Sequence, residues 1–138
     1  MQNSSGVRVV SSDTATKMRT MLESVVSDNG TAPSAAIPGY RVAGKTGTAQ
    51  RYDANCQCYS GYTASFIGFA PADKPQYVVS VAIQGPQGLH WGGSLGGPVF
   101  KSVMSFVLQS RHVQPTSPLT SPFPLTEKDL LASAKAQQ

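Results

Sequence analysis

The chain has 138 residues, 40% of them hydrophobic and 13% charged, which allows one domain with a modest core. Its net charge of +4 comes from 11 Lys and Arg against 7 Asp and Glu, and the basic residues are scattered, which argues against nucleic-acid binding. No apolar run approaches the roughly 20 residues of a membrane-spanning helix. The first residues of the chain are polar and lack the positively charged segment with which a signal peptide begins.

The first half of the chain predicts one helix and one strand. A short apolar run at residues 7–10 is predicted as a strand end. An amphipathic helix is expected near residues 13–27, with Asp28-Asn29-Gly30 as its stop signal. Prolines make residues 31–39 a loop, and a strand is expected near residues 40–48. The helix prediction depends on apolar residues at helical spacing: Met18, Met21, Leu22, Val25 and Val26.

The second half predicts an antiparallel hairpin and a second helix. Residues 51–61 are polar and are predicted as an irregular loop. Residues 62–70 and 76–83 are rich in β-branched and aromatic residues and are separated by a short turn, so they are expected to pair. Residues 84–98 are rich in glycine and are predicted as a loop. A helix to residue 110 follows, apolar on more than one face and therefore expected to be deeply packed.

The order helix, three strands, helix predicts an α+β fold with a partial antiparallel sheet of three strands flanked by helices. Three strands make a thin layer, which looks like half of a larger sheet. Four of the 10 prolines fall within residues 115–124. We therefore place the domain at residues 1–111 and expect residues 112–138 to be a Pro-rich, largely disordered tail.

Two cysteines, Cys56 and Cys58, lie in the predicted loop at residues 51–61. With His90 and His112 as the only histidines, the chain has too few soft ligands in one place for a metal site, and no metal is expected. The spacing also differs from the redox motif Cys-x-x-Cys. A local disulfide and a pair of loop thiols are the two interpretations.

The most informative motif is Gly44-Lys45-Thr46-Gly47-Thr48. Lys45 carries a positive charge, Thr46 and Thr48 carry short hydroxyl donors, and the two glycines let a ligand approach the backbone. The motif favours a surface that holds a small anionic ligand against a strand edge. Because alternate residues of a strand point to opposite sides, Lys45 and Thr46 can serve one ligand only if it lies along that edge.

Residues 39–46 also match the phosphate-loop pattern G-x-x-x-x-G-K-[ST]. A phosphate loop follows a buried strand and opens a helix. Here residues 40–43 are strand formers, and the residues after Thr46 do not start a helix. A nucleotide-binding protein is therefore a weak alternative.

The Lys-Thr-Gly-Thr motif on a strand resembles the third motif of serine acyltransferases that react with penicillin. The resemblance extends over about residues 7–110. It identifies the chain as similar to the C-terminal part of the transpeptidase domain of class B penicillin-binding proteins of the cell-division type. The segments that carry it are Met21-Leu-Glu-Ser-Val-Val, Gly30-Thr-Ala, residues 39–50, Tyr62 to Pro71, Tyr77-Val-Val-Ser-Val, and Gly92-Gly to Phe100.

Two further motifs of this family lie elsewhere in its domain. Ser-x-x-Lys carries the nucleophile, and no serine of this chain is followed three residues later by lysine. Ser27-Asp28-Asn29 matches the Ser-x-Asn motif, but we interpret it as a helix terminus. The resemblance thus implies a fragment of a peptidoglycan D,D-transpeptidase. The chain alone is expected to be inactive and not to be acylated by penicillin.

The resemblance also implies roles for individual residues. Lys45, Thr46, Gly47 and Thr48 would bind the terminal carboxylate of a D-Ala-D-Ala stem peptide or of a β-lactam. The backbone N–H of Thr48 would be one of two oxyanion-hole donors. No cofactor is implied. A non-catalytic β-lactam or peptidoglycan sensor would share this binding wall and stays an alternative.

Finally, the resemblance implies that the whole protein is anchored at the extracytoplasmic face of the bacterial membrane and works with cell-division proteins. His90 and Trp91 are interpreted as loop-packing residues beside the site. Arg41 and Arg51 flank the motif and are expected to be solvated.

Overall fold

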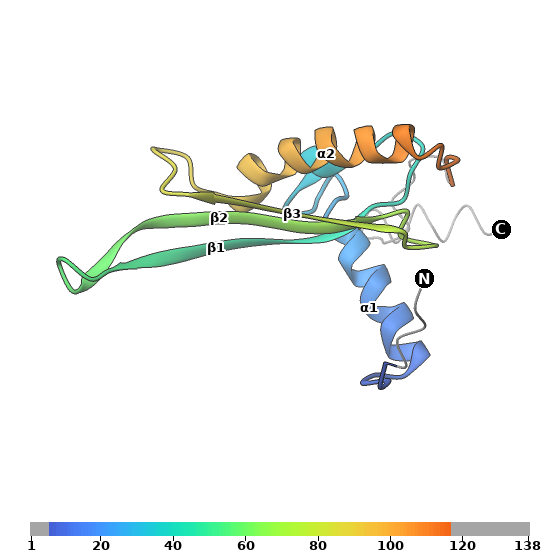
Figure 1. Cartoon of the computed structure of the whole chain (residues 1–138), viewed down its shortest axis with the longest axis horizontal. Helices are drawn as coiled ribbons and strands as arrows, with labels where there is room; N and C mark the ends of the chain where they lie inside the picture. The colour runs from blue at the N-terminus through green and yellow to red at the C-terminus, as the bar shows by residue number, and fades with distance from the viewer. Residues whose placement is uncertain (1–5, 117–138) are drawn as a thin grey trace.

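The computed structural model describes residues 6–116. These form one antiparallel sheet with strand order β1-β2-β3, as the sequence predicts for this α+β fold. Figure 1 shows α2 lying along one face of the sheet, while α1 runs away on the other side. The elements are α1 (Ser12–Ser24), η1 (Pro33–Ala35), β1 (Ala43–Asp53), β2 (Cys58–Ala70), β3 (Tyr77–Gln84) and α2 (Gly92–Ser110).

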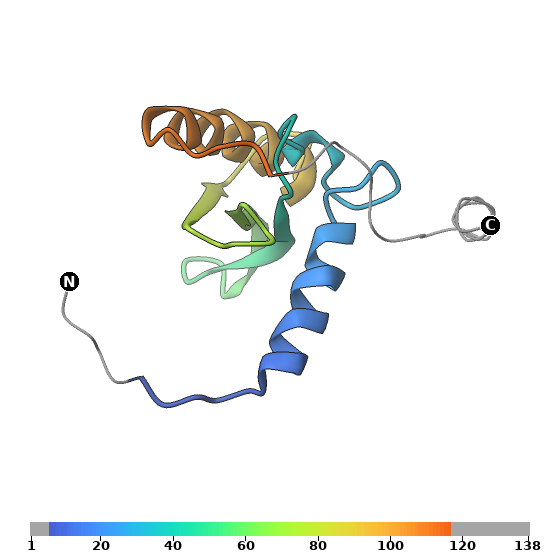
Figure 2. The same cartoon turned by 90° about the vertical axis from the view of Figure 1, so that its right-hand side faces the viewer.

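Helix α1 begins where the sequence predicts and ends earlier. The Ser11 hydroxyl accepts a hydrogen bond from the backbone N–H of Thr14 at 3.1 Å, which caps the helix. After Ser24 the chain continues in tight turns, and α1 contacts β1 alone among the described strands. The end-on view in Figure 2 shows α1 descending from the sheet. The predicted strand end at residues 7–10 is wrong, because those residues are exposed and have no strand partner.

Residues 51–61 are not the predicted irregular loop. β1 extends to Asp53, β2 begins at Cys58, and these two residues still pair. A Cys56–Cys58 disulfide closes the turn, which confirms the disulfide interpretation. This hairpin extends beyond the end of β3, because only the part of β2 from Thr63 onward pairs with β3 (Figure 1). Polar strands supported only by each other carry a weak sequence signal, which explains the error.

Helix α2 begins at Gly92, earlier than predicted, because its glycines serve close packing rather than a loop. A Cβ at Gly96 would lie 2.9 Å from the Cβ of Phe66 on β2. The prediction that α2 is deeply packed is correct for one of its faces and wrong for the other. Phe100 and Met104 are fully buried, whereas the opposite face is exposed at Val99, Val103 and Phe106.

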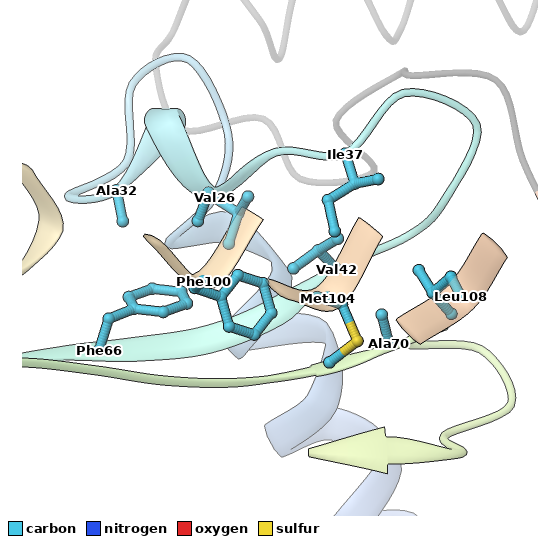
Figure 3. Close-up of a cluster of buried hydrophobic side chains, with 10 residues drawn as sticks. Val26, Ala32, Ile37, Val42, Phe66, Ala70, Phe100, Met104 and Leu108 are labelled. Atoms are coloured by element: carbon cyan, nitrogen blue, oxygen red, sulfur yellow. The ribbon is translucent and has the colours of Figure 1, made fainter. Parts of the chain in front are cut away.

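The core lies between α2, β2 and the segment that joins α1 to β1 (Figure 3). Phe66 and Phe100 meet edge to face at its centre, with ring centroids 4.9 Å apart. Residues 112–116 also contact this body, because the Tyr40 hydroxyl donates to the backbone oxygen of Val113 at 2.7 Å. Most of the predicted tail, residues 117–138, lies outside the described residues.

Candidate functional site at the edge of strand β1

The motif Gly44–Thr48 lies entirely within β1, which is an edge strand of the sheet. Thr46 pairs with Phe66 and Thr48 with Ala64, two residues that are buried on the face covered by α2. Because directly paired residues share a face, the side chains of Thr46 and Thr48 lie on the α2 side of the sheet. Lys45 belongs to the opposite face.

The ammonium group of Lys45 nevertheless reaches Thr46. Its Nζ donates to the backbone oxygen of Thr46 at 3.0 Å and to the Thr46 Oγ1 at 3.3 Å. The flexible lysine stem therefore bends around the free edge of β1. Cation and hydroxyl meet there, which is the arrangement that a ligand lying along the strand edge requires.

Thr48 is held by the start of helix α2. The backbone N–H of Gly92 donates to the Thr48 Oγ1 at 3.2 Å. Trp91, at the N-cap position, provides no side-chain cap, so the threonine hydroxyl satisfies one of the helix's free N–H groups. A side chain at Gly92 would overlap the carbonyl oxygens of Gly47 and Ser65, so this close approach requires glycine.

A third hydroxyl lies at the site, from a residue to which the sequence analysis gave no role. The Thr31 Oγ1 is 3.2 Å from the Thr46 Oγ1. Thr31 precedes η1, and its backbone oxygen lies against Gly93 of α2. The Ser34 hydroxyl donates to the backbone oxygen of Gly93 at 3.0 Å. Thr31 belongs to the Gly30-Thr-Ala segment, one of those that carry the family resemblance. Its contact with Thr46 depends on the fold of the loop, so the sequence alone did not indicate it.

Aromatic rings border the site beyond Thr48. His90 stacks on Tyr62 with centroids 4.0 Å apart and an angle of 9° between the planes. The His90 Nδ1 lies 3.1 Å from the backbone oxygen of Gly88. Trp91 lies next to His90, at 4.9 Å between centroids, and is exposed. His90 thus packs on the sheet, while Trp91 presents a free aromatic surface beside the first turn of α2.

The two arginines that flank the motif differ. Arg51 is exposed, as expected. The expectation that Arg41 is solvated is wrong, because it forms a bidentate ion pair with the buried Glu23, at 2.8 and 2.7 Å. The hydrogen bonds that Arg41 donates to the Glu23 carboxylate raise the pKa of Arg41 above its ordinary value. This pair ties the end of α1 to the segment that leads into β1.

The geometry contradicts the phosphate-loop alternative. Gly44, Lys45 and Thr46 lie within a strand, and the chain after them continues as strand to Asp53 rather than opening a helix. Within residues 6–116, no three His, Cys, Asp or Glu residues are grouped to hold a metal ion. None of the helices described there is long and apolar enough to span a membrane.

The site is thus a strand edge on which the Lys45 ammonium and three threonine hydroxyls lie beside the start of a long helix. Comparison with known proteins assigns the family of the chain. Residues 2–105 match the family model for the penicillin-binding protein transpeptidase domain. The chain therefore belongs to the penicillin-binding transpeptidase family, and it corresponds to the C-terminal part of that domain in class B penicillin-binding proteins.

Individual relatives agree with this assignment. Penicillin-binding protein PbpB of Mycolicibacterium smegmatis is 44% identical over 131 residues, which cover 88% of this chain and 20% of that protein. The transpeptidase domain of Burkholderia pseudomallei penicillin-binding protein 3 is 47% identical with a TM-score of 0.71, over 82% of this chain and 34% of that one. Mycobacterium tuberculosis penicillin-binding protein 3, solved with aztreonam, is 36% identical with a TM-score of 0.70, over 83% and 28%. The chain thus spans about a fifth to a third of the length of these relatives.

Proposed function

We propose that this segment forms the substrate-binding wall of a peptidoglycan D,D-transpeptidase. Lys45 would attract the terminal carboxylate of a D-Ala-D-Ala stem peptide, Thr46 and Thr48 would donate hydrogen bonds to it, and Gly47 would leave room for its approach. The observation that supports this most directly is the pair of hydrogen bonds that the two hydroxyls already accept, from the Lys45 ammonium and from the Gly92 N–H.

The hydrogen-bonding capacity of the two hydroxyls explains why these bonds matter. A hydroxyl has one proton to donate and two lone pairs with which to accept. An ammonium group and a backbone N–H can only donate, so each one occupies a lone pair of the threonine oxygen and leaves its proton available. A carboxylate can only accept. Thr46 and Thr48 are therefore prepared to donate to an anion, and bonds of this charge-assisted kind are the stronger ones.

The reaction that this wall would serve is acyl transfer. A serine outside this chain attacks the carbonyl carbon of the penultimate D-Ala, and the bond to the terminal D-Ala breaks, which leaves an acyl-serine. An amine of a neighbouring peptidoglycan strand then attacks that ester and releases the serine. We propose the backbone N–H of Thr48 as one of two donors to the developing oxyanion. Losing such a donor typically costs about 2.7–4 kcal/mol of transition-state stabilisation.

A β-lactam presents a carboxylate and a reactive carbonyl in the same way, so we propose β-lactams as ligands of this wall. Family membership supports a whole protein that is membrane-anchored, acts on the extracytoplasmic side and works with cell-division proteins. A non-catalytic sensor would present the same wall. It would differ in leaving no acyl-enzyme that an acceptor amine resolves.

A chimera tests the proposal. Residues 2–105 of this chain would replace the matching segment of the B. pseudomallei transpeptidase domain, which supplies the serine. We expect a fluorescent penicillin to label that serine. Lys45→Met should slow labelling by about tenfold or more, because a hydrogen bond to a charged group contributes roughly 1.5–3 kcal/mol. Lys101→Met, at an exposed position on α2, is the matched control and should not change the rate.

Two results would contradict the proposal. One is a chimera that melts cooperatively and is never labelled. The other is equal rates for the Lys45 and Lys101 variants. The isolated chain has a separate expectation: it should show no stoichiometric labelling of a single serine, because it lacks the Ser-x-x-Lys motif.

A further inference from the structure

We infer that Thr31 is a positioning residue for this site: it donates to the Thr46 oxygen and so commits the single Thr46 proton to the carboxylate of the ligand. The inference rests on the proposed function, because it concerns how Thr46 binds that carboxylate. It adds a residue that lies outside the Lys-Thr-Gly-Thr motif and 15 residues before Thr46.

Two protein groups meet at the Thr46 oxygen. The Lys45 Nζ lies 3.3 Å from it and the Thr31 Oγ1 lies 3.2 Å from it. The lysine can only donate, so it takes one of the two lone pairs. The Thr31 hydroxyl has two choices: it accepts the Thr46 proton, or it donates to the second lone pair. Only the second choice leaves Thr46 a proton for the ligand.

A bound carboxylate selects between these two states. Because a carboxylate only accepts, Thr46 must donate to it, and then Thr31 must donate to Thr46. The result is a chain of donors that runs from Thr31 through Thr46 to the ligand. Each hydrogen bond in such a chain polarises the next one, which strengthens the bond to the anion.

The backbone that carries Thr31 is fixed from two sides. The N–H of Ala32 donates to the backbone oxygen of Val25 at 2.9 Å, which ties the loop to the end of α1. On the other side the Thr31 carbonyl lies against the Cα of Gly93, and Ser34 binds the oxygen of Gly93 at 3.0 Å. The backbone position from which the Thr31 hydroxyl reaches Thr46 is thus held in place before a ligand arrives, as preorganised binding requires.

The test uses the same chimera and the second-order rate constant of acylation by benzylpenicillin. Thr31→Val keeps the shape and removes the hydroxyl, and we expect acylation to be about two- to tenfold slower, the usual worth of one hydrogen bond. Thr31→Ser restores a hydroxyl and should recover most of the rate. Thr16→Val, at an exposed threonine of α1, is the matched control.

Two comparisons separate positioning from a general structural effect. In a Thr46→Val background, Thr31→Val should have no further effect, since the residue through which it acts is gone. With the methyl ester of benzylpenicillin, which lacks the carboxylate, the Thr31→Val penalty should disappear. A structural defect would slow both ligands equally and would persist in the Thr46→Val background.

The outcomes distinguish this inference from the proposed function. A folded wild-type chimera that is never acylated would refute the proposed function, and this inference with it. A chimera that is acylated equally fast with and without the Thr31→Val substitution would refute the inference alone. Equal penalties for benzylpenicillin and its methyl ester would also refute it.

Discussion

The ion pair between Glu23 and Arg41 gives the sharpest stability prediction. Its side chains are 3% and 35% exposed, and the two hydrogen bonds are 2.7 and 2.8 Å long. Glu23→Ala would leave the guanidinium without its partner where the chain enters β1. We expect this substitution to lower the free energy of unfolding substantially, because the Arg41 charge would lose its hydrogen-bonded counter-ion and keep only the more distant charge of Asp73.

The size of the loss follows from burial. Removing one partner of a fully buried ion pair typically costs about 3–5 kcal/mol. Arg41 is more than a third exposed and can regain some hydration, so we expect about 1–3 kcal/mol for Glu23→Ala. Replacing both residues by Met should recover most of this loss, since an apolar pair of similar volume leaves no unpaired charge.

The chain offers a matched control on the same helix. Asp13 and Lys17 form an ion pair at 2.8 Å, but their side chains are 73% and 68% exposed. Lys17→Ala should therefore cost only about 0.3–0.5 kcal/mol. Urea denaturation of the chimera and its variants measures both values on one scale. If Glu23→Ala and Lys17→Ala cost the same, the argument from burial is wrong.

Three further predictions concern the packing, the sheet edge and the turn. Gly93→Ala should lower the free energy of unfolding by about 1–3 kcal/mol, because the new methyl group would overlap a loop carbonyl, whereas Gly6→Ala, with no neighbouring atom, should be neutral in the same denaturation assay. Val78→Lys should reduce self-association of the isolated chain in sedimentation experiments, since Val78 is 70% exposed on the unpaired edge strand of the described sheet; unchanged association would exclude this edge as its cause. Reducing the Cys56–Cys58 disulfide should leave acylation of the chimera unchanged, because the turn is exposed and far along the hairpin; a slower rate would mean that the turn supports the site.

The sequence predicted correctly those helices and strands whose own residues show a helical or strand pattern. β3 has alternating and β-branched residues, and the structure places it within one residue of the prediction at each end. The start of α1 was equally readable, since a serine cap precedes its apolar spacing. Such patterns depend only on residues close together in the sequence, so they can be recognised without knowledge of the fold.

The predictions fail where contacts between residues distant in the sequence determine the structure. Glycine favours loops when it is considered alone, yet Gly92 and Gly96 lie in α2, because only glycine lets the helix backbone approach β1 and β2 so closely. The Glu23–Arg41 pair joins residues 18 positions apart, and the Thr31–Thr46 contact joins residues 15 apart. No periodicity indicates such pairs, because a loop of irregular shape brings them together.

The two threonines of the wall accept hydrogen bonds from different kinds of positive group. Thr46 accepts from the full charge of Lys45, and Thr48 accepts from an N–H at the start of α2, where the helix dipole places partial positive charge. Each group draws electron density from the threonine oxygen and makes its proton a better donor. The wall therefore presents more positive potential than one lysine would supply. Part of that potential is built into the backbone of α2, where no side-chain substitution removes it.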